Sequence, residues 1–272
     1  MLQHLNIKLM GMELYDFFNV ISFFSLLSYN LIQLNQKKKL LSQWSQRIQG
    51  NIVKKSKGTF LQVFGETNFW ALFEVIIISM AQYLPAGYLN FSFGELFGTG
   101  ANYFGLAFFC PLIVIAFCLC LRINPLKQLD LITPAYPLAL SFSKFACFCC
   151  GCCGGMECSF GMYNYYKDEL QFPVQLVEVA LAVLLFFFLH NYRKIARVGT
   201  MYPTYLTLYS VTRFFSEFLR GEKNVWGMLK LYHIFCIAGI IVGIVELALV
   251  HKFGEKITTS FEQKAKKVEQ LE

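Results

Sequence analysis

The feature that most constrains this chain is a series of apolar runs, each about as long as a membrane is thick. A membrane-spanning helix needs about 20 mostly apolar residues. Only 15% of the 272 residues are charged and 56% are hydrophobic, whereas about a quarter of the residues in an ordinary soluble domain are charged. We therefore predict an all-α, polytopic membrane protein with seven transmembrane helices, roughly at residues 14–34, 69–89, 102–121, 130–155, 173–190, 201–219 and 231–250.

The basic residues are distributed unevenly between these runs, and their distribution indicates an orientation. With the N-terminus outside, 17 of the 24 lysines and arginines fall on the inner side, five on the outer side and two within spans. Cytoplasmic loops carry such an excess of positive charge. We therefore predict a single membrane domain over 1–272 with the N-terminus outside and the C-terminus inside. Its basic connector at 36–58 and its charged tail at 251–272 are expected to be cytoplasmic, and the tail has a helical pattern. The connector is expected to face anionic lipid rather than nucleic acid.

The run at 201–219 carries a stripe of polar side chains. Arg213, Glu217 and Arg220 follow one another at i, i+4 and i+7, and Tyr209 precedes them by four residues, so all four share one helical face. An arginine inside a membrane helix costs about 2.5–3.5 kcal/mol on insertion scales, so the stripe is expected to face the bundle interior. Two interpretations remain open: a structural ion pair that ties helices together, or a phosphate site, because the guanidinium fork binds phosphate bidentately.

Two neighbouring runs add candidate polar residues. Gln175 and Glu178 lie three residues apart in the run at 173–190, where they form either a polar packing seam or part of a site. Lys144 lies deep in the run at 130–155. Together with the two arginines of the stripe, this lysine would complete an anion site in the outer half of the bundle.

A cluster of cysteines closes the run at 130–155. Five of the chain's ten cysteines lie between Cys147 and Cys153, next to Gly151 and Gly155. A structural zinc site usually adds a second cysteine pair or histidines at defined spacing, so we predict no metal site. Most of these cysteines are interpreted as small apolar packing residues, with a catalytic thiol beside Lys144 as the alternative. The glycines are expected to permit close helix packing or to end the helix.

Three segments of the chain resemble conserved segments of a known family. LYSVTRFFSEFLRGE at 208–222 is similar to Y-x-x-x-R-F-x-x-E-F-x-R, and FPVQLVE at 172–178 is similar to H-P-x-Q-L-Y-E. The stretch at 130–155 is similar to a signature of the form D…P followed by G-R-I-G-N-F-x-N-G-E and a glycine. Over about residues 100–250 the chain thus resembles prolipoprotein diacylglyceryl transferase, a family of seven-helix bacterial membrane enzymes, while residues 1–100 match only in their pattern of spans.

The chain departs from this family at three positions. Lys144 stands where the family has its signature arginine, and Cys147 where it has its first asparagine. The family also carries a histidine in an H-G-G segment that opens its third span, and here Phe104 or Tyr103 takes that place. With this imidazole missing, Glu217, Glu178 or a tyrosine is expected to act as the base.

The resemblance implies an enzyme of the bacterial inner membrane that needs no cofactor. Such an enzyme transfers a diacylglyceryl group from phosphatidylglycerol, or a similar anionic phospholipid, to the lipobox cysteine thiol of a prolipoprotein signal peptide. The implied catalytic residues are Arg213, Glu217 and Tyr209, and the implied substrate-binding residues are Lys144, Arg220, Glu178, Gln175, Gly151 and Gly155. Two alternatives stay open: a catalytically impaired relative that binds lipid or a membrane partner, and a thiol-based redox or metal protein.

Overall fold

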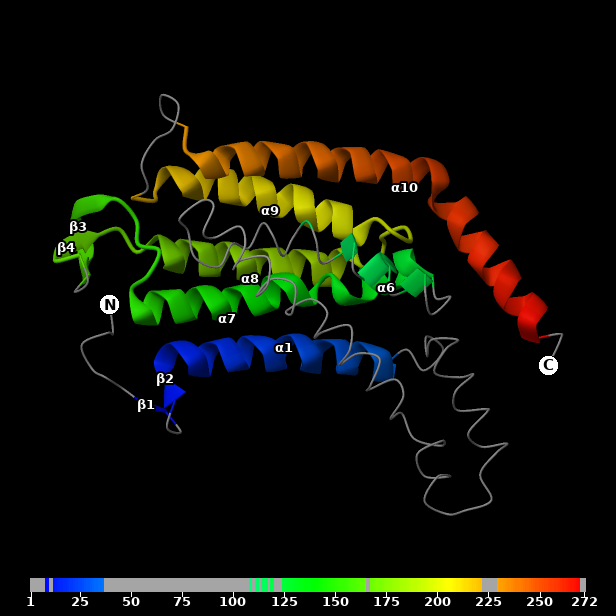
Figure 1. Cartoon of the computed structure of the whole chain (residues 1–272), viewed down its shortest axis with the longest axis horizontal. Helices are drawn as coiled ribbons and strands as arrows, with labels where there is room; N and C mark the ends of the chain where they lie inside the picture. The colour runs from blue at the N-terminus through cyan, green and yellow to red at the C-terminus, as the bar shows by residue number, and fades with distance from the viewer. Residues whose placement is uncertain are drawn as a thin grey trace, which may run out of the picture. The chain divides into compact units, whose positions relative to one another are not determined.

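The computed structural model in Figure 1 describes residues 8–9, 12–36, 124–164, 167–221 and 229–269, with isolated helical residues between 108 and 119. Most of the described residues are helical. The chain divides into two compact units. The first contains Met1–Leu26 and Thr133–Ala248, and the second contains Leu27–Ile132 and Leu249–Glu272.

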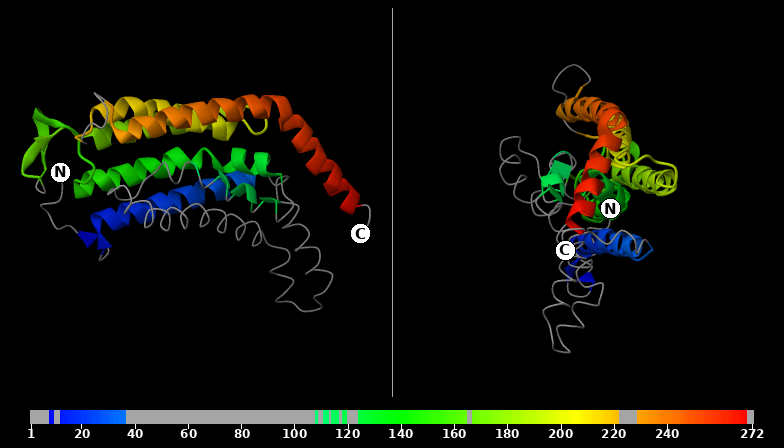
Figure 2. Two further views of the ribbon diagram at one scale, coloured as in Figure 1. Left: turned by 45° about the horizontal axis from the view of Figure 1, so that its top comes forward. Right: turned by 90° about the vertical axis from the view of Figure 1, so that its right-hand side faces the viewer.

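The first unit is built on four helices that run alongside one another (Figures 1 and 2). These are α7 (Ala135–Cys150), α8 (Val174–Tyr192), α9 (Met201–Phe218) and the first part of α10 (Leu231–Glu269). Helix α8 packs against both α7 and α9. Helix α10 approaches α9 closely at Gly243, where an added Cβ would lie only 3.0 Å from the carbonyl oxygen of Pro203. Small residues permit such close backbone approach in membrane helices.

The apolar run at 130–155 does not form one continuous helix. Helix α6 (Pro125–Ile132) ends inside it, a turn follows, and α7 begins at Ala135 after Pro134. Proline fits the first turn of a helix because its missing N–H has no intrahelical partner there. Helix α7 ends at Gly151, which has the left-handed φ of 71° that glycine adopts without a steric penalty. The predicted break at these glycines is therefore confirmed at Gly151.

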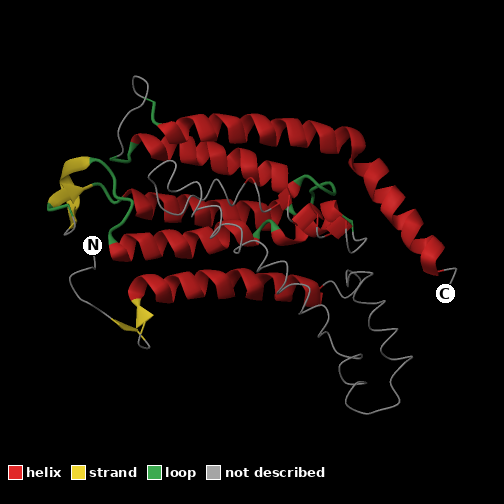
Figure 3. Ribbon diagram, in the orientation of Figure 1, coloured by secondary structure: helices red, strands yellow, loops and turns green. Residues whose placement is uncertain are grey.

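The polar segment after α7 is a β-hairpin, which the all-α prediction did not include (Figure 3). Strand β3 (Glu157–Asn164) pairs antiparallel with β4 (Glu169–Gln171), with a register shift between Glu157 and Met162. A second, two-residue hairpin of β1 (Lys8–Leu9) and β2 (Met12–Glu13) precedes α1 (Leu14–Gln36). The N-terminal part of α1 lies along α7, where Ser22 Oγ donates a hydrogen bond to the carbonyl oxygen of Ala139 at 2.7 Å.

The predicted helices in the described part of the chain are found close to their expected bounds. Helices α1, α8 and α9 match the runs at 14–34, 173–190 and 201–219. Helix α10 contains the run at 231–250 and continues through the charged tail, as its helical pattern predicted. Among the described residues, Val174–Tyr192 and Leu231–Gln263 are long and apolar enough to cross a membrane. The connector at 36–58, the runs at 69–89 and 102–121, and Tyr103 and Phe104 lie wholly or largely outside the described residues.

The second unit contains an exposed ion pair, in contrast to the buried ion pairs of the first unit described below. Lys127 of α6 and Glu262 of α10 form it, with 2.7 Å between Nζ and Oε1. Both side chains are open to solvent, at 36% and 52% exposure.

Candidate functional site

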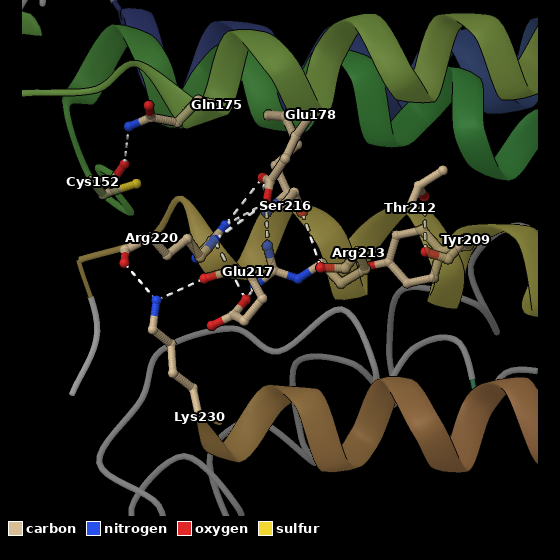
Figure 4. Close-up of polar contacts among 11 residues, drawn as sticks. Cys152, Gln175, Glu178, Tyr209, Thr212, Arg213, Ser216, Glu217, Arg220 and Lys230 are labelled. Atoms are coloured by element: carbon tan, nitrogen blue, oxygen red, sulfur yellow. Dashed lines mark hydrogen bonds and ion pairs between the residues drawn. The ribbon is translucent and has the colours of Figure 1, made fainter. Parts of the chain in front are cut away.

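A buried carboxylate on α8 is the centre of the polar interior of the first unit. Lys144 Nζ lies 2.9 Å from Glu178 Oε2. Arg213 Nη1 donates to Glu178 Oε1 (Figure 4). Arg220 Nη2 lies 2.9 Å from Oε1 and 3.0 Å from Oε2 of the same carboxylate. Three cations thus meet one carboxylate: one from α7, one from α9, and Arg220, two residues beyond the end of α9.

A second buried carboxylate lies beside the first. Glu217 Oε2 is 2.6 Å from Arg213 Nη2, the i,i+4 partner that the stripe on α9 predicted, and 3.8 Å from Arg220 Nε. We call Lys144, Glu178, Arg213, Glu217 and Arg220 the charge cluster. Three cations and two carboxylates give it a formal charge of +1.

Lys230, just before α10, brings a fourth cation to the outer edge of the charge cluster. Its Nζ donates to the carbonyl oxygens of Glu217 at 2.7 Å and Arg220 at 2.6 Å, and the side chain is buried. These carbonyls lie at the C-terminal end of α9, where cations are favoured because the last carbonyls of a helix lack intrahelical partners. With Lys230 included, the formal charge of the region is +2.

The surplus of positive charge distinguishes this arrangement from a simple ion pair. Glu217 is fully buried, and Glu178, Arg213 and Arg220 are each exposed by 7% or less. Buried charges are tolerated only when they are paired and hydrogen-bonded, and here two carboxylates face four cations. The region is therefore suited to accept an additional anion.

A small pocket lies against the charge cluster and joins a polar end to an apolar wall. Lys144, Glu178 and Arg213 line its polar end together with Tyr209, and its volume is about 20 Å³. The remaining lining residues are apolar or hydroxyl-bearing: Leu140, Leu181, Ala182, Leu185, Thr212 and Ser216. The pocket therefore places charged side chains at one end of a mostly apolar wall.

An aromatic stack holds Tyr209 at the edge of this pocket. The ring of Tyr209 stacks on Tyr205 with centroids 5.9 Å apart, and Tyr205 stacks on Tyr136 of α7 at 5.6 Å. All three rings are buried. Offset stacking of aromatic rings contributes about 0.5–1.5 kcal/mol per pair beyond burial, so the stack fixes the position of α9 against α7.

Gly151 belongs to the turn after α7, Gln175 contacts this turn, and Gly155 pairs with Arg220 of the charge cluster. Gln175 Nε2 donates to the carbonyl oxygen of Cys152 at 2.7 Å (Figure 4). Gly155 forms a β-bridge with Arg220, and an added Cβ would lie 2.7 Å from the carbonyl oxygen of Leu219. The structure therefore groups eight of the nine sequence-predicted residues around the cluster and its supporting turn, and it places the ninth, Tyr209, at the adjacent pocket.

Glu178 was predicted as a site residue, but its place as the common partner of three cations was not predicted. Lys230 was missed altogether. Lys230 was counted only among the outer basic residues, although it lies beside the run at 231–250 and contacts the end of α9. The signal that could have found Lys230 is its place directly before a membrane span, where a helix end needs a donor or a cation.

The fold and the cluster define a helical membrane protein with a buried, net-positive site next to a partly apolar pocket. Comparison with known proteins gives the family: the model of prolipoprotein diacylglyceryl transferase matches residues 71–249, and the chain belongs to this family. The match agrees with the resemblance of the three sequence segments and covers the charge cluster.

Three curated relatives have low identity to the chain. The phosphatidylglycerol–prolipoprotein diacylglyceryl transferase of Clostridium tetani is 31% identical over 157 residues, which is 54% of this chain and 63% of the relative. The enzyme of the same name from Campylobacter hominis is 31% identical over 124 residues, which is 45% of this chain and 44% of the relative. A transferase of that name from Clostridium perfringens is 23% identical over 159 residues, 53% of this chain and 60% of the relative. The chain thus spans between about two fifths and two thirds of the lengths of these relatives and is a divergent member.

Proposed function

We propose that this protein transfers a diacylglyceryl group from phosphatidylglycerol to the lipobox cysteine thiol of prolipoproteins. The observation that carries this proposal is the convergence of Lys144, Arg213 and Arg220 on Glu178, which gives a buried site with surplus positive charge. The names of the curated relatives support the same substrates. The proposed setting is the bacterial inner membrane, with one domain of seven spans, the N-terminus outside and the C-terminus inside.

The charge cluster supplies what this reaction requires at the phosphate. The substrate thiol attacks a glyceryl carbon, a C–S bond forms, the C–O bond to phosphate breaks, and glycerol phosphate leaves with the electron pair. Negative charge therefore grows on the phosphate in the transition state, and preorganised donors in a water-poor site stabilise such charge strongly. Arg213 and Arg220 are assigned this role, with Lys144 as the third cation.

The pocket beside the cluster is assigned to the start of the lipid tails. Its volume of about 20 Å³ holds about one water molecule rather than a lipid. Binding of phosphatidylglycerol therefore requires α8 and α9 to separate or their side chains to rotate. Tyr209 lines this pocket and is positioned to donate a hydrogen bond to the substrate.

A second candidate function is a lipid-binding relative without catalysis, and one observation favours it. The family histidine is absent from its segment. Both carboxylates that were expected to replace it, Glu178 and Glu217, contact arginines. A carboxylate held by cations is a weak base because its charged form is stabilised. On this alternative the protein binds the lipid and transfers nothing.

A lipidation assay separates the two functions. The protein is expressed in a bacterial strain whose own transferase can be depleted, and the mass of a reporter prolipoprotein is followed by mass spectrometry. We expect a mass increase equal to one diacylglyceryl group on the lipobox cysteine. An unmodified reporter, with the protein correctly inserted in the membrane, would support the lipid-binding alternative and exclude transfer.

Arg213 provides the corresponding residue test. We expect Arg213→Ala to lower lipidation about 100- to 1000-fold, the cost of removing one donor to a developing oxyanion. Arg213→Lys keeps the charge but loses the bidentate fork, and it is expected to fall between the wild type and Arg213→Ala. Full activity of Arg213→Ala would refute the assigned phosphate site.

A further inference from the structure

Three cysteine sulfurs converge next to the charge cluster, and the proposed transfer reaction does not use them. The Sγ atoms of Cys147, Cys152 and Cys153 lie within 4.8 Å of one another. Cys147 belongs to the last turn of α7, whereas Cys152 and Cys153 lie in the turn that follows. None of the three forms a disulfide. Three free thiols from two parts of the backbone therefore face a common point.

The backbone of this turn brings the sulfurs together. Gly151 and Cys153 both have left-handed conformations, with φ of 71° and 57°. A left-handed conformation is uncommon for a residue other than glycine, asparagine or aspartate. The chain folds back over the end of α7, so that Cys152 Sγ lies 3.8 Å from the carbonyl oxygen of Cys147. The turn is thus shaped to return two cysteines to a third.

Two buried amide side chains from other elements hold the turn in this shape. Gln175 of α8 donates to the carbonyl oxygen of Cys152 at 2.7 Å. Asn164 of β3 donates to the carbonyl oxygen of Gly151 at 3.1 Å. Gln175 and Asn164 are themselves buried at 0% and 1% exposure. Supporting hydrogen bonds of this kind position ligand-bearing groups and are as important to a metal site as the ligands themselves.

We propose that Cys147, Cys152 and Cys153 form a thiolate site for Zn²⁺, although the sequence favoured no metal site and kept a metal protein only as an alternative. Thiolate ligands favour zinc over harder divalent ions such as Mg²⁺ and Ca²⁺, which prefer oxygen ligands. Zn–S bonds of about 2.3 Å in tetrahedral geometry place sulfurs about 3.8 Å apart, so the three sulfurs need to close by about 1 Å or less.

The position of this site in the bundle suggests its use. Cys147 follows Lys144 by three residues on α7, and Gln175 precedes Glu178 by three residues on α8. Residues three apart on a helix are neighbours on one face. Along the axis of α7, Cys147 and Lys144 are therefore separated by only about 4.5 Å, less than one helical turn.

A three-thiolate zinc site keeps one coordination position open, as catalytic zinc sites do. We assign this position to the substrate thiol, an assignment that rests on the proposed transfer function. A thiol that coordinates zinc is deprotonated outright, so the site replaces the base that the absent histidine would have supplied. The bound sulfur then forms the C–S bond, the phosphate C–O bond breaks, and glycerol phosphate leaves with the electron pair and accepts the released proton. No oxidation or reduction takes place.

Zinc binding is tested directly, without reference to activity. The full-length protein is purified in nanodiscs with a phosphine reductant, loaded with Zn²⁺, dialysed and analysed by mass spectrometry for metal. We expect about one zinc ion per chain that survives dialysis. The triple variant Cys147→Ser/Cys152→Ser/Cys153→Ser is expected to bind none, whereas Cys158→Ser, a cysteine of β3 outside the group, is expected to keep it. A zinc content of the wild type no higher than that of the triple variant, or a disulfide among the three cysteines under these conditions, would overturn the site.

A milder variant covers the case in which the triple variant does not fold. Cys153 is exposed on the turn, so Cys153→Ser is expected to fold normally and to weaken zinc binding at least 10-fold. Cobalt supplies an independent readout, because Co²⁺ bound to thiolates gives a sulfur-to-metal charge-transfer absorption. We expect this band in the wild type and a reduced band in Cys153→Ser. Equal bands in the two proteins would exclude Cys153 as a ligand.

The reporter assay then distinguishes failure of this inference from failure of the proposed function. Lipidation that is lost in Cys153→Ser and kept in Cys158→Ser supports zinc as the activator of the substrate thiol. Lipidation that persists unchanged in the triple variant leaves the transfer function intact and removes the role of the cysteines. Zinc binding without any lipidation leaves the metal site intact and refutes the transfer function.

Discussion

The polarity of the two sides of helix α8 is the reverse of that in a soluble protein, where apolar side chains are buried and charged ones are exposed. Its inner side carries Glu178, a carboxylate bound to three cations and exposed by only 6%. Its outer side carries Leu184, Phe187 and Phe188, with exposures of 65%, 57% and 47%. Charges lie inside the bundle and large apolar side chains lie outside it. A membrane explains this reversal, because lipid solvates apolar groups as well as a protein core does.

Helix α10 repeats the contrast and shows that it is not peculiar to one helix. Ile234, Ile237, Ile241 and Ile244 follow one another at helical spacing, with exposures of 42–57%. At the buried start of the same helix, His233 is fully buried and accepts a hydrogen bond at Nδ1 from the backbone N–H of Lys230 at 2.9 Å. A polar group in an apolar environment needs a partner inside the protein. The difference between the two sides predicts that substitutions on the inner side lower the free energy of unfolding strongly and that substitutions on the outer side lower it little.

The largest effect is expected for removal of the shared carboxylate. Glu178→Ala leaves Lys144, Arg213 and Arg220 without their common partner in a low-dielectric interior. Breaking a buried pair by removal of one partner costs about 3–5 kcal/mol. We therefore expect a loss of this size in the free energy of unfolding, measured by denaturant titration of the protein in nanodiscs.

An exposed ion pair serves as the control for this variant. Glu262→Ala breaks the pair with Lys127, whose two side chains are 52% and 36% exposed. Exposed pairs contribute about 0–1 kcal/mol, so this variant is expected to be nearly as stable as the wild type. Equal losses for the two variants would mean that Glu178 is not the electrostatic centre of the bundle.

An intermediate effect is expected at the outer edge of the charge cluster. Lys230→Met keeps the length of the side chain but removes its hydrogen bonds to the carbonyl oxygens of Glu217 and Arg220. Hydrogen bonds to a charged group contribute about 1.5–3 kcal/mol, and we expect a stability loss in this range. Lys167→Met, at an exposed position of the hairpin turn, is the matched control and should change stability by less than about 0.5 kcal/mol. A stable Lys230→Met protein would show that the end of α9 needs no cation.

The features that could be predicted from the sequence are those that depend on local periodicity. The run at 201–219 matches α9 and the run at 173–190 matches α8, because a helix in a membrane needs a fixed length of apolar residues. The pair of Arg213 and Glu217 was also predictable, because residues four apart meet on one helix.

The features that could not be predicted depend on contacts between distant segments. The hairpin of β3 and β4 is held by pairing of Glu157 with Gln171 across a register shift, and a short polar strand has no distinctive apolar pattern. Glu178 meets Arg213 and Arg220 only because α8 packs against α9. Spacing within one helix reports its face but not which helix lies opposite that face.

The smallest effect is expected on the outer side of α8, where it tests the difference between the two sides of this helix most closely. Leu184 and Leu189 are the same residue type on the same helix, with exposures of 65% and 0%. Leu189→Ala creates a cavity and is expected to cost about 2–5 kcal/mol. Leu184→Ala leaves only space that lipid fills, and in nanodiscs it should cost less than about 0.5 kcal/mol. Because both variants lose the same atoms, the difference between them isolates the surroundings of the side chain. Similar losses at both positions would place Leu184 against protein rather than lipid and would remove the outer side of α8 from the membrane-facing surface.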